Sequence, residues 1–169
     1  MAKRSSSLLN AIDLLTEQHT EVDELFEQLA GNGTNREAVF VELADNLAAH
    51  TTIEEKLFYP RVMSDQTSDL LHESVEEHLA MKRVLADLVT MKLDAAEFKA
   101  KLAVLKEEFS HHAHDVEESE LFPMLRKTMD PDELAGLGNE LLVLYEQLLT
   151  SEPRFEVPKE TTEAAPLPA

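Results

Sequence analysis

Histidine and glutamate side chains recur in this chain at positions where a helix would face an apolar core. The spacing His50-x-x-x-Glu54 places an imidazole and a carboxylate one helical turn apart. Burying a carboxylate without a partner costs several kcal/mol, so such a residue normally pairs with a charge or binds a metal. His19, His78 and His112 occupy the same kind of position in other segments. These residue types together indicate coordination of metal cations.

Helical phase is what places these residues inside. Apolar residues recur at alternating steps of three and four, which is the stripe of a helix packed in a bundle. His19 falls within the stripe of the first segment, His50 and Glu54 within that of the second, and His78 within that of the third. A single histidine on such a stripe is more often a hydrogen-bonded core residue. Four segments that each contribute one, two of them with a carboxylate, favour a metal site.

The fourth segment leaves two pairings open. His112 continues one apolar stripe and Glu117 belongs to a second, and the two stripes join only across a step of five residues. A π-helical turn, which often occurs at functional sites, would accommodate the extra residue, and we favour this pairing. The alternative is His114 with Glu118, one ordinary turn apart. The candidate ligands are therefore His19, His50, Glu54, His78, His112 and Glu117, with His114 and Glu118 as alternatives in the fourth segment.

Donor chemistry narrows the choice of metal. Four imidazoles and two carboxylates exceed what one tetrahedral zinc ion uses, and calcium and magnesium prefer oxygen ligands alone. Two iron ions bridged by the two carboxylates fit best, with manganese or zinc as lesser options. The ferritin-like pattern needs Glu-x-x-His on two helices, and Glu108-x-x-His111 is its only instance here. The chain has no cysteine, which excludes thiolate ligands, disulfides and cysteine nucleophiles.

The elements that must position these residues are all helical. The chain contains four glycines and is rich in Leu, Ala and Glu, which is typical of an all-α protein. In the fifth segment Asp130 is the expected N-cap and Pro131 the first helical residue. Five helices are expected, at about residues 7–30, 35–63, 68–92, 94–128 and 131–149.

An internal repeat indicates how these helices are arranged. The segment from His50 to Pro60 resembles the segment from His112 to Pro123, as if one helix pair were used twice. Two antiparallel pairs with short loops form an up-down-up-down four-helix bundle, to which the fifth helix is added. We therefore expect one domain over residues 1–150. Residues 151–169 hold four prolines among Glu, Thr and Ala, which predicts a disordered tail.

Charge and hydropathy restrict the partners. The formal net charge of −19 argues against a nucleic-acid backbone and against an anionic membrane surface as partners. Acidic residues outside the candidate ligands, Glu76 and Glu77 among them, are expected on a solvated face. No apolar run approaches the roughly 18 residues of a membrane span, and the start of the chain lacks the core of a signal peptide. The expectation is a cytoplasmic protein, and its oligomeric state stays open.

The ordered set of motifs resembles the hemerythrin-like, HHE cation-binding family over about residues 8–149. Residues 130–145 also resemble the additional C-terminal helix of bacterial members. The matching stretches are Leu14-Leu15-Thr-Glu-Gln-His19, His50-x-x-x-Glu54 with Leu57-Phe58-Tyr59-Pro60, Glu76-Glu77-His78, and His111-His112 through Glu117-Glu118 to Leu121-Phe122-Pro123.

The resemblance implies a non-haem di-iron centre with an oxo or hydroxo bridge inside a four-helix bundle. By position, the six candidate residues would be its ligands, and Glu54 and Glu117 would bridge the two ions. Family chemistry includes binding O₂ or NO, reacting with peroxide, and sensing or storing iron. Oxygen-carrying members have a second histidine one turn before His78, where this chain has Ser74, so its ligand shell differs from that of a carrier.

Three functions follow from these observations. The first is a binding or sensing module whose di-iron centre takes O₂, NO or peroxide. The second is an enzyme that disproportionates peroxide, reduces NO or oxidises ferrous iron, because Ser74 leaves a coordination position open. The third is a metal-free helical adaptor, in which the histidines and glutamates satisfy one another. We place the binding module first.

Overall fold

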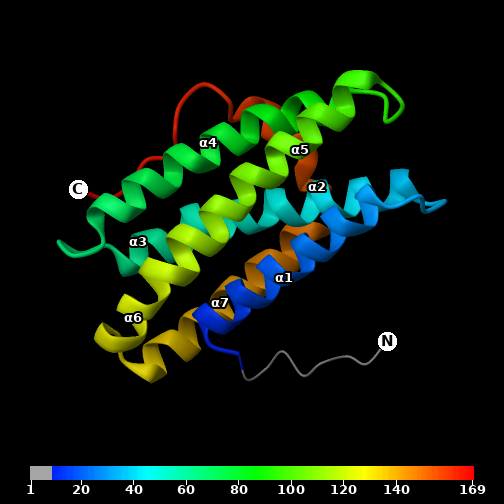
Figure 1. The fold of residues 1–169 in the computed structure, drawn as a ribbon. Coiled ribbons are helices and arrows are strands. Elements are labelled where there is room, and N and C mark those ends of the chain that lie inside the picture. The colour runs from blue at the N-terminus through cyan, green and yellow to red at the C-terminus, as the bar shows by residue number, and fades with distance from the viewer. Residues whose placement is uncertain (1–8) are drawn as a thin grey trace.

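The chain folds as a bundle of helices. A computed structural model describes residues 9–169 and contains no β-strand in that range (Figure 1). This confirms the predicted all-α fold and the four-helix bundle with one additional helix. No helix in the described range is both long enough and apolar enough to cross a bilayer. The four bundle helices begin with α1 (Ala11–Ala30), α2 (Arg36–Ile53), α4 (Ser68–Thr90) and α5 (Ala96–Ser110).

Two of the four bundle helices pass through π-helical turns. After α2, the π-helix Glu54–Phe58 leads into α3 (Tyr59–Val62). After α5, the π-helix His111–Leu121 leads into α6 (Phe122–Thr128). The second π-helix confirms the wide turn predicted between His112 and Glu117.

The first π-helix was not expected, and it changes which residues face the core. A π-turn takes up one more residue than an α-turn, so it rotates the following residues relative to a regular helix. Phe58 and Tyr59 are consequently buried, whereas Leu57, which continues the regular stripe, is only partly buried.

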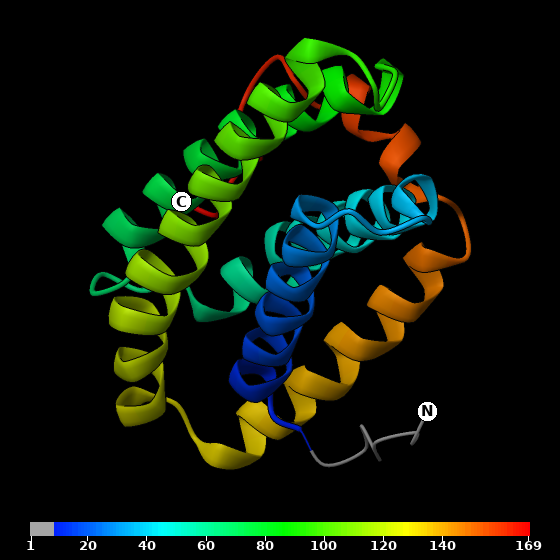
Figure 2. The same ribbon diagram turned by 45° about the vertical axis from the view of Figure 1, so that its right-hand side comes forward.

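The helices pair in sequence order. In Figures 1 and 2, α1 lies beside α2 and α4 beside α5, while α7 (Pro131–Leu149) packs against α1 and α2. The start of α7 is as predicted: Asp130 is its N-cap, and Asp130 Oδ1 accepts a hydrogen bond from the Asp132 N–H at 2.8 Å. The glycine-rich loop at residues 31–35 joins α1 to α2.

The apolar core is divided into two clusters. One surrounds Leu15, Phe58 and Leu121, and the other surrounds Phe26 and Phe109. Along each bundle helix, the buried histidines and glutamates lie where the residues of the first cluster give way to those of the second. The polar layer is therefore closed off from water on both sides by packed apolar side chains.

The C-terminal tail has a defined path, contrary to the predicted disorder. It forms two short 3₁₀ turns, Pro153–Phe155 and Val157–Lys159, and in Figure 2 it runs from the end of α7 to α4. Arg154 Nη1 donates to Asp45 Oδ2 on α2 at 2.7 Å, and Val157 is buried. Arg83 on α4 donates to the carbonyl of Thr161 at 3.0 Å. These long-range contacts outweigh the local tendency of a proline-rich segment to remain unfolded.

The contact between α7 and the start of α1 depends on a glycine. A Cβ atom added at Gly138 would lie 2.5 Å from the carbonyl oxygen of Leu9 and 2.8 Å from the amide nitrogen of Ala11. These are backbone atoms, which cannot move aside as the tip of a side chain can. At Gly136, two residues earlier in the same helix, an added Cβ would meet nothing within 4 Å.

We expect Gly138→Ala to lower the free energy of unfolding by about 1–3 kcal/mol, because overpacking forces the two backbones apart. At about 2–4 °C per kcal/mol for a chain of this size, thermal denaturation would show the loss as a lower Tm. Gly136→Ala is the matched control and should stabilise the helix by about 0.5–1 kcal/mol. Equal effects at the two positions would contradict the close approach of α7 to α1.

Candidate metal centre

The structure brings all six predicted residues together in the polar layer. Each is at most 1% exposed. Three regular helices contribute one histidine each, the first π-helix contributes a glutamate, and the second π-helix contributes both a histidine and a glutamate. In chain order the residues are His19, His50, Glu54, His78, His112 and Glu117.

The two glutamates lie between imidazoles of different helices. Glu54 Oε1 is 3.1 Å from His50 Nε2, and Glu54 Oε2 is 3.1 Å from His78 Nε2. Glu117 Oε2 is 3.1 Å from His19 Nε2 and 3.7 Å from His112 Nε2. Each carboxylate therefore has the position that a ligand shared by two cations needs.

The donors form two groups that share one residue. His19, His50, Glu54 and Glu117 each offer one atom, and these atoms lie within 4.8 Å of one another. Glu54, His78 and His112 form a second such group. Two overlapping groups of buried nitrogen and oxygen donors fit a metal site.

Every imidazole of the centre is held at its outward nitrogen by a side chain from the neighbouring helix. We call these four acceptors the outer ring. The hydrogen bonds are His50 Nδ1 to Gln18 (2.7 Å), His78 Nδ1 to Glu55 (2.9 Å), His112 Nδ1 to Glu77 (3.1 Å) and His19 Nδ1 to Glu118 (2.7 Å). These hydrogen bonds form a closed ring. A residue of each bundle helix binds the histidine of the next helix, and Glu118 of the last helix binds His19 of α1.

The outer ring determines what the imidazoles present to the interior. When Nδ1 donates its hydrogen to the outer ring, Nε2 carries a lone pair directed inward, as in metal-binding histidines. His78 Nε2 and His112 Nε2 lie 3.0 Å apart, so the two nitrogens form a hydrogen bond when one carries a proton and can bind one cation together when neither does. Four further inward atoms are buried without a hydrogen bond: His19 Nε2, His50 Nε2, Glu54 Oε1 and Glu117 Oε2. Buried polar atoms normally have partners, so the donor set fits metal cations.

Protons compete with metal ions for these nitrogen atoms. Burial lowers the pKa of His19, but the carboxylates of Glu117 and Glu118, one beside each ring nitrogen, outweigh it and raise that pKa to about 9. Burial likewise opposes a charge on His112, but the carboxylates of Glu117, Glu54 and Glu77 raise its pKa to about 10. Both imidazoles are consequently protonated at both ring nitrogens at neutral pH when no metal is bound.

Tyr59 lies in the middle of the centre, although the sequence analysis did not include it among the ligands. Its hydroxyl donates to Glu117 Oε1 at 2.8 Å and lies 3.1 Å from His78 Nε2 and 3.3 Å from both His112 Nε2 and Glu54 Oε2. Burial, followed by the charges of Glu117 and Glu54, raises the pKa of this phenol well above its usual range. The phenol therefore keeps its proton in the absence of metal.

A sequence signal for Tyr59 exists in the internal repeat. Tyr59 precedes Pro60 as Phe122 precedes Pro123, so a polar ring replaces an apolar one at equivalent positions. Phe122 stacks on the ring of His19, and Tyr59 lies against the ring of His78 with centroids 5.4 Å apart. The repeat thus builds two similar half-sites, of which only one carries a phenolic oxygen.

The alternative pair of the fourth segment does not form part of the inner group. The His114 side chain is 35% exposed, and its Nε2 lies 2.8 Å from Asp23 Oδ2. Glu118 contacts His114 Nδ1 at 3.1 Å and belongs to the outer ring through His19.

Sequence reasoning missed the outer ring, and it assigned Glu77 to a solvated face. A signal was present, because each outer residue is the immediate neighbour of an inner one. The four dipeptides are Gln18-His19, Glu54-Glu55, Glu77-His78 and Glu117-Glu118.

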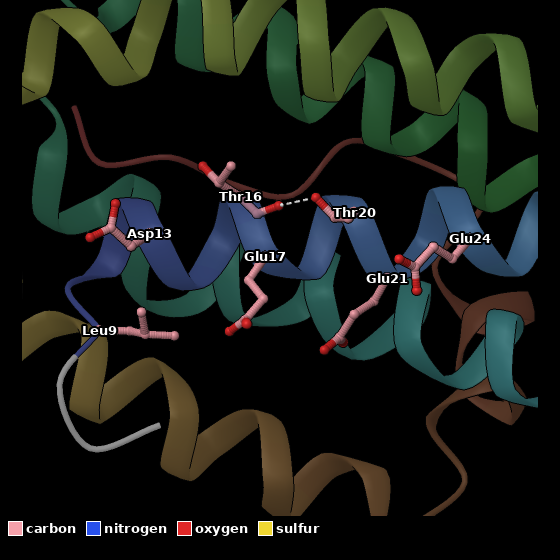
Figure 3. A pocket seen from close by; sticks show the side chains of 7 residues that line it. All are labelled: Leu9, Asp13, Thr16, Glu17, Thr20, Glu21 and Glu24. Atoms are coloured by element: carbon pink, nitrogen blue, oxygen red, sulfur yellow. Dashed lines mark hydrogen bonds between the residues drawn. The ribbon is translucent and has the colours of Figure 1, made fainter. Parts of the chain in front are cut away.

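Two surface hollows show how the centre relates to solvent. One, of about 570 Å³, runs along α1 and carries acidic residues such as Glu17, Glu21 and Glu24, but no residue of the inner group (Figure 3). Another, of about 410 Å³, lies between the C-terminal tail and the residues Glu55 and Lys82. Because Glu55 holds His78, the second hollow approaches the centre to within one side chain.

Comparisons with known proteins agree with this geometry. The family model described as the hemerythrin HHE cation binding domain matches residues 10–125. The chain is 28% identical over 134 residues to a protein of Nostoc sp. (strain PCC 7120 / SAG 25.82 / UTEX 2576) named DNA nickase. That match covers 78% of this chain but 38% of the Nostoc protein, so this chain spans well under half of its length.

Two mycobacterial proteins match over nearly their whole length. Rv2633c of Mycobacterium tuberculosis (strain ATCC 25618 / H37Rv) is 28% identical over 144 residues, which cover 83% of this chain and 88% of that protein. The crystal structure of an HHE cation binding domain-containing protein, the Rv2633c homolog from Mycobacterium kansasii, has the same fold. It has a TM-score of 0.75 and 24% identity, and the match covers 91% of this chain and 95% of that one. This chain belongs to the hemerythrin HHE cation-binding family, whose buried histidines and glutamates it places between four helices.

Proposed function

We propose that this protein holds two iron ions in the buried centre and uses them to bind a small oxidant or gas such as O₂, NO or peroxide. One observation carries the proposal: four imidazoles direct Nε2 inward while the outer ring holds each Nδ1. A pair of iron ions would supply open coordination positions and one-electron redox chemistry for such small ligands.

The two donor groups divide the ligands between the ions. His19 and His50 would hold one ion, and His78 and His112 the other. Glu54 and Glu117 would hold both. The phenol oxygen of Tyr59 faces the side of His78 and His112, and we assign it as a further ligand there. Imidazole combined with hard oxygen donors suits iron better than the all-oxygen metals.

The chain itself performs three tasks around these ions. The two apolar clusters exclude bulk water from both sides of the polar layer. The outer ring fixes the orientation of each imidazole. Tyr59 places its phenolic oxygen 2.8 Å from Glu117 Oε1, on the side of His78 and His112.

A second candidate function is peroxide disproportionation, in which two H₂O₂ give two H₂O and one O₂. Ser74, which is buried where oxygen-carrying members have a histidine, favours it, because a missing ligand leaves a coordination position open for peroxide. NO reduction and ferrous oxidation remain within the same class. The metal-free adaptor is the weakest candidate, since the pairs His19–Glu117 and His50–Glu54 would then be buried at 3.1 Å without a well-aligned hydrogen bond.

Metal content is the first test of the proposal. We expect about two iron ions per chain, lost on chelation, with a lower Tm for the metal-free protein. A ligand that binds only the folded state stabilises it by about 2.7 kcal/mol at one hundred times its Kd. His50→Gln should lose metal, whereas His72→Ala, at an exposed histidine of α4, should retain it. A chain that binds no iron, and whose Tm does not rise when ferrous iron is added anaerobically, would refute the proposal.

Binding should also release protons. Because the pKa values of His19 and His112 are raised to about 9 and about 10, both imidazoles are protonated at pH 7 without metal. Metal affinity should therefore rise between pH 6 and pH 8, and calorimetry in buffers of different ionisation enthalpy should detect the released protons. The metal-free protein should lose stability as the pH rises from about 6.5, the unperturbed value, to about 9–10, because a raised folded-state pKa stabilises only the protonated form. Heats that do not depend on the buffer would contradict this assignment.

Tyr59 offers a test of its own. We expect Tyr59→Phe to keep the fold, to weaken metal binding by about 10- to 100-fold, and to abolish a phenolate-to-iron absorption band in the visible range. Tyr145→Phe is the matched control, because Tyr145 is the only other tyrosine in the chain and lies on α7, in the apolar cluster. If Tyr59→Phe and Tyr145→Phe have identical spectra and affinities, Tyr59 is not a ligand.

A further inference from the structure

Outside the buried centre, Glu73, Glu77 and His111 form a third group of possible ligands. One atom from each lies within 4.8 Å of the other two. Glu73 and Glu77 are one turn apart on α4, and His111 opens the π-helix that follows α5. The His111 side chain is 54% exposed, so this group faces solvent, whereas the six inner residues do not.

The ring of His111 is oriented in the same way as the imidazoles of the buried centre. Its Nδ1 lies 3.3 Å from Asp115 Oδ2, one turn further along the helix. Its Nε2 lies 3.0 Å from Glu77 Oε2. A histidine that donates Nδ1–H to a carboxylate directs the lone pair of Nε2 to the other side, and this is the arrangement that orients metal-ligating histidines.

Glu77 supplies an independent observation. Its Oε1 accepts the hydrogen bond from His112 Nδ1 at 3.1 Å. Its Oε2 is buried, makes no hydrogen bond, and is the atom that faces His111. The two atoms are close enough to share a proton, and a divalent cation that took the place of this proton would be held by the same two atoms.

The negative charge of α4 in this region also favours a bound cation. Glu73 and Glu77 are like charges at positions one turn apart, which destabilises a helix by a few tenths of a kcal/mol. A cation bound between them would convert this repulsion into attraction. The side chains of Glu73 and His111 are exposed, so an ion can reach both from the solvent.

We propose that Glu73, Glu77 and His111 bind a first-row divalent cation, such as Zn²⁺, Mn²⁺ or Fe²⁺, at a solvent-facing site separate from the buried centre. One imidazole nitrogen and two carboxylates provide three ligands, and water completes the shell, as in open sites. The imidazole disfavours calcium and magnesium. Glu77 joins this surface site to His112 of the centre through the two oxygens of one carboxylate.

The test is a Zn²⁺ titration of the full-length protein after the buried centre has been loaded with iron. Total zinc and iron per chain would be measured by equilibrium dialysis and mass spectrometry. We expect the unmodified protein to bind about one Zn²⁺ more than His111→Ala or Glu73→Gln. The matched controls His72→Ala and Glu76→Gln change an exposed histidine and an exposed glutamate of α4 outside the group, and they should keep the additional ion.

The ring protons of His111 provide a second readout by NMR, because Zn²⁺ should shift them before it shifts those of His72. Equal zinc binding by the unmodified protein and His111→Ala would overturn the proposal. Equal loss in all four variants would also overturn it, since that result indicates diffuse binding to an acidic surface. Each comparison is a difference between the protein and its variant, so its outcome does not depend on what the buried centre holds.

Discussion

Four hydrogen bonds from imidazole Nδ1 atoms connect the bundle helices into a closed ring, and the rest of the centre depends on them. Each bond joins two helices, so it fixes the rotation of one helix relative to the next as well as the tautomer of its histidine. If one helix turned about its axis, its outer-ring residue would lose the hydrogen bond to the neighbouring histidine. Its inner residue would at the same time move out of the centre. The ring thereby couples the packing of the bundle to the direction of the four Nε2 lone pairs.

The two π-helices make this coupling possible on the helices that carry carboxylates. Glu54 and Glu117 point inward, while the next residues, Glu55 and Glu118, reach the histidines of neighbouring helices. In the first π-helix the wide turn also brings Tyr59 into the interior. The two wide turns therefore place consecutive carboxylates in different roles and leave the apolar residues beyond them in contact with the core.

The sequence was sufficient to predict the six inner residues, because burying a charged side chain without a partner is costly. A single histidine on an apolar stripe can be a core residue or a metal ligand, but Glu54 one turn after His50 points to a ligand. The mismatched stripes around Glu117 predicted the wide turn that the structure has. The outer ring and Tyr59 could not be read in the same way. Glu77 is adjacent to His78 and has the spacing of a solvated residue; only the position of His112 on another helix gives it a role. The tail was misjudged for a similar reason, since Arg154 finds Asp45 only after the bundle has formed.

The wide turn between His112 and Glu117 has a consequence for how the chain can change during evolution. Because this turn takes up one more residue than an α-turn, the apolar residues on either side of it keep the same phase as in a regular helix one residue shorter. Deleting one residue there would let the segment close into regular α-turns, with Phe122 still on the ring of His19 and Leu125 still in its apolar cluster. Deleting one residue from a regular turn, such as the one before Phe109, would instead rotate everything beyond it by about 100°. Within this helix the wide turn is thus the place where a lineage can gain or lose one residue and keep the core on both sides.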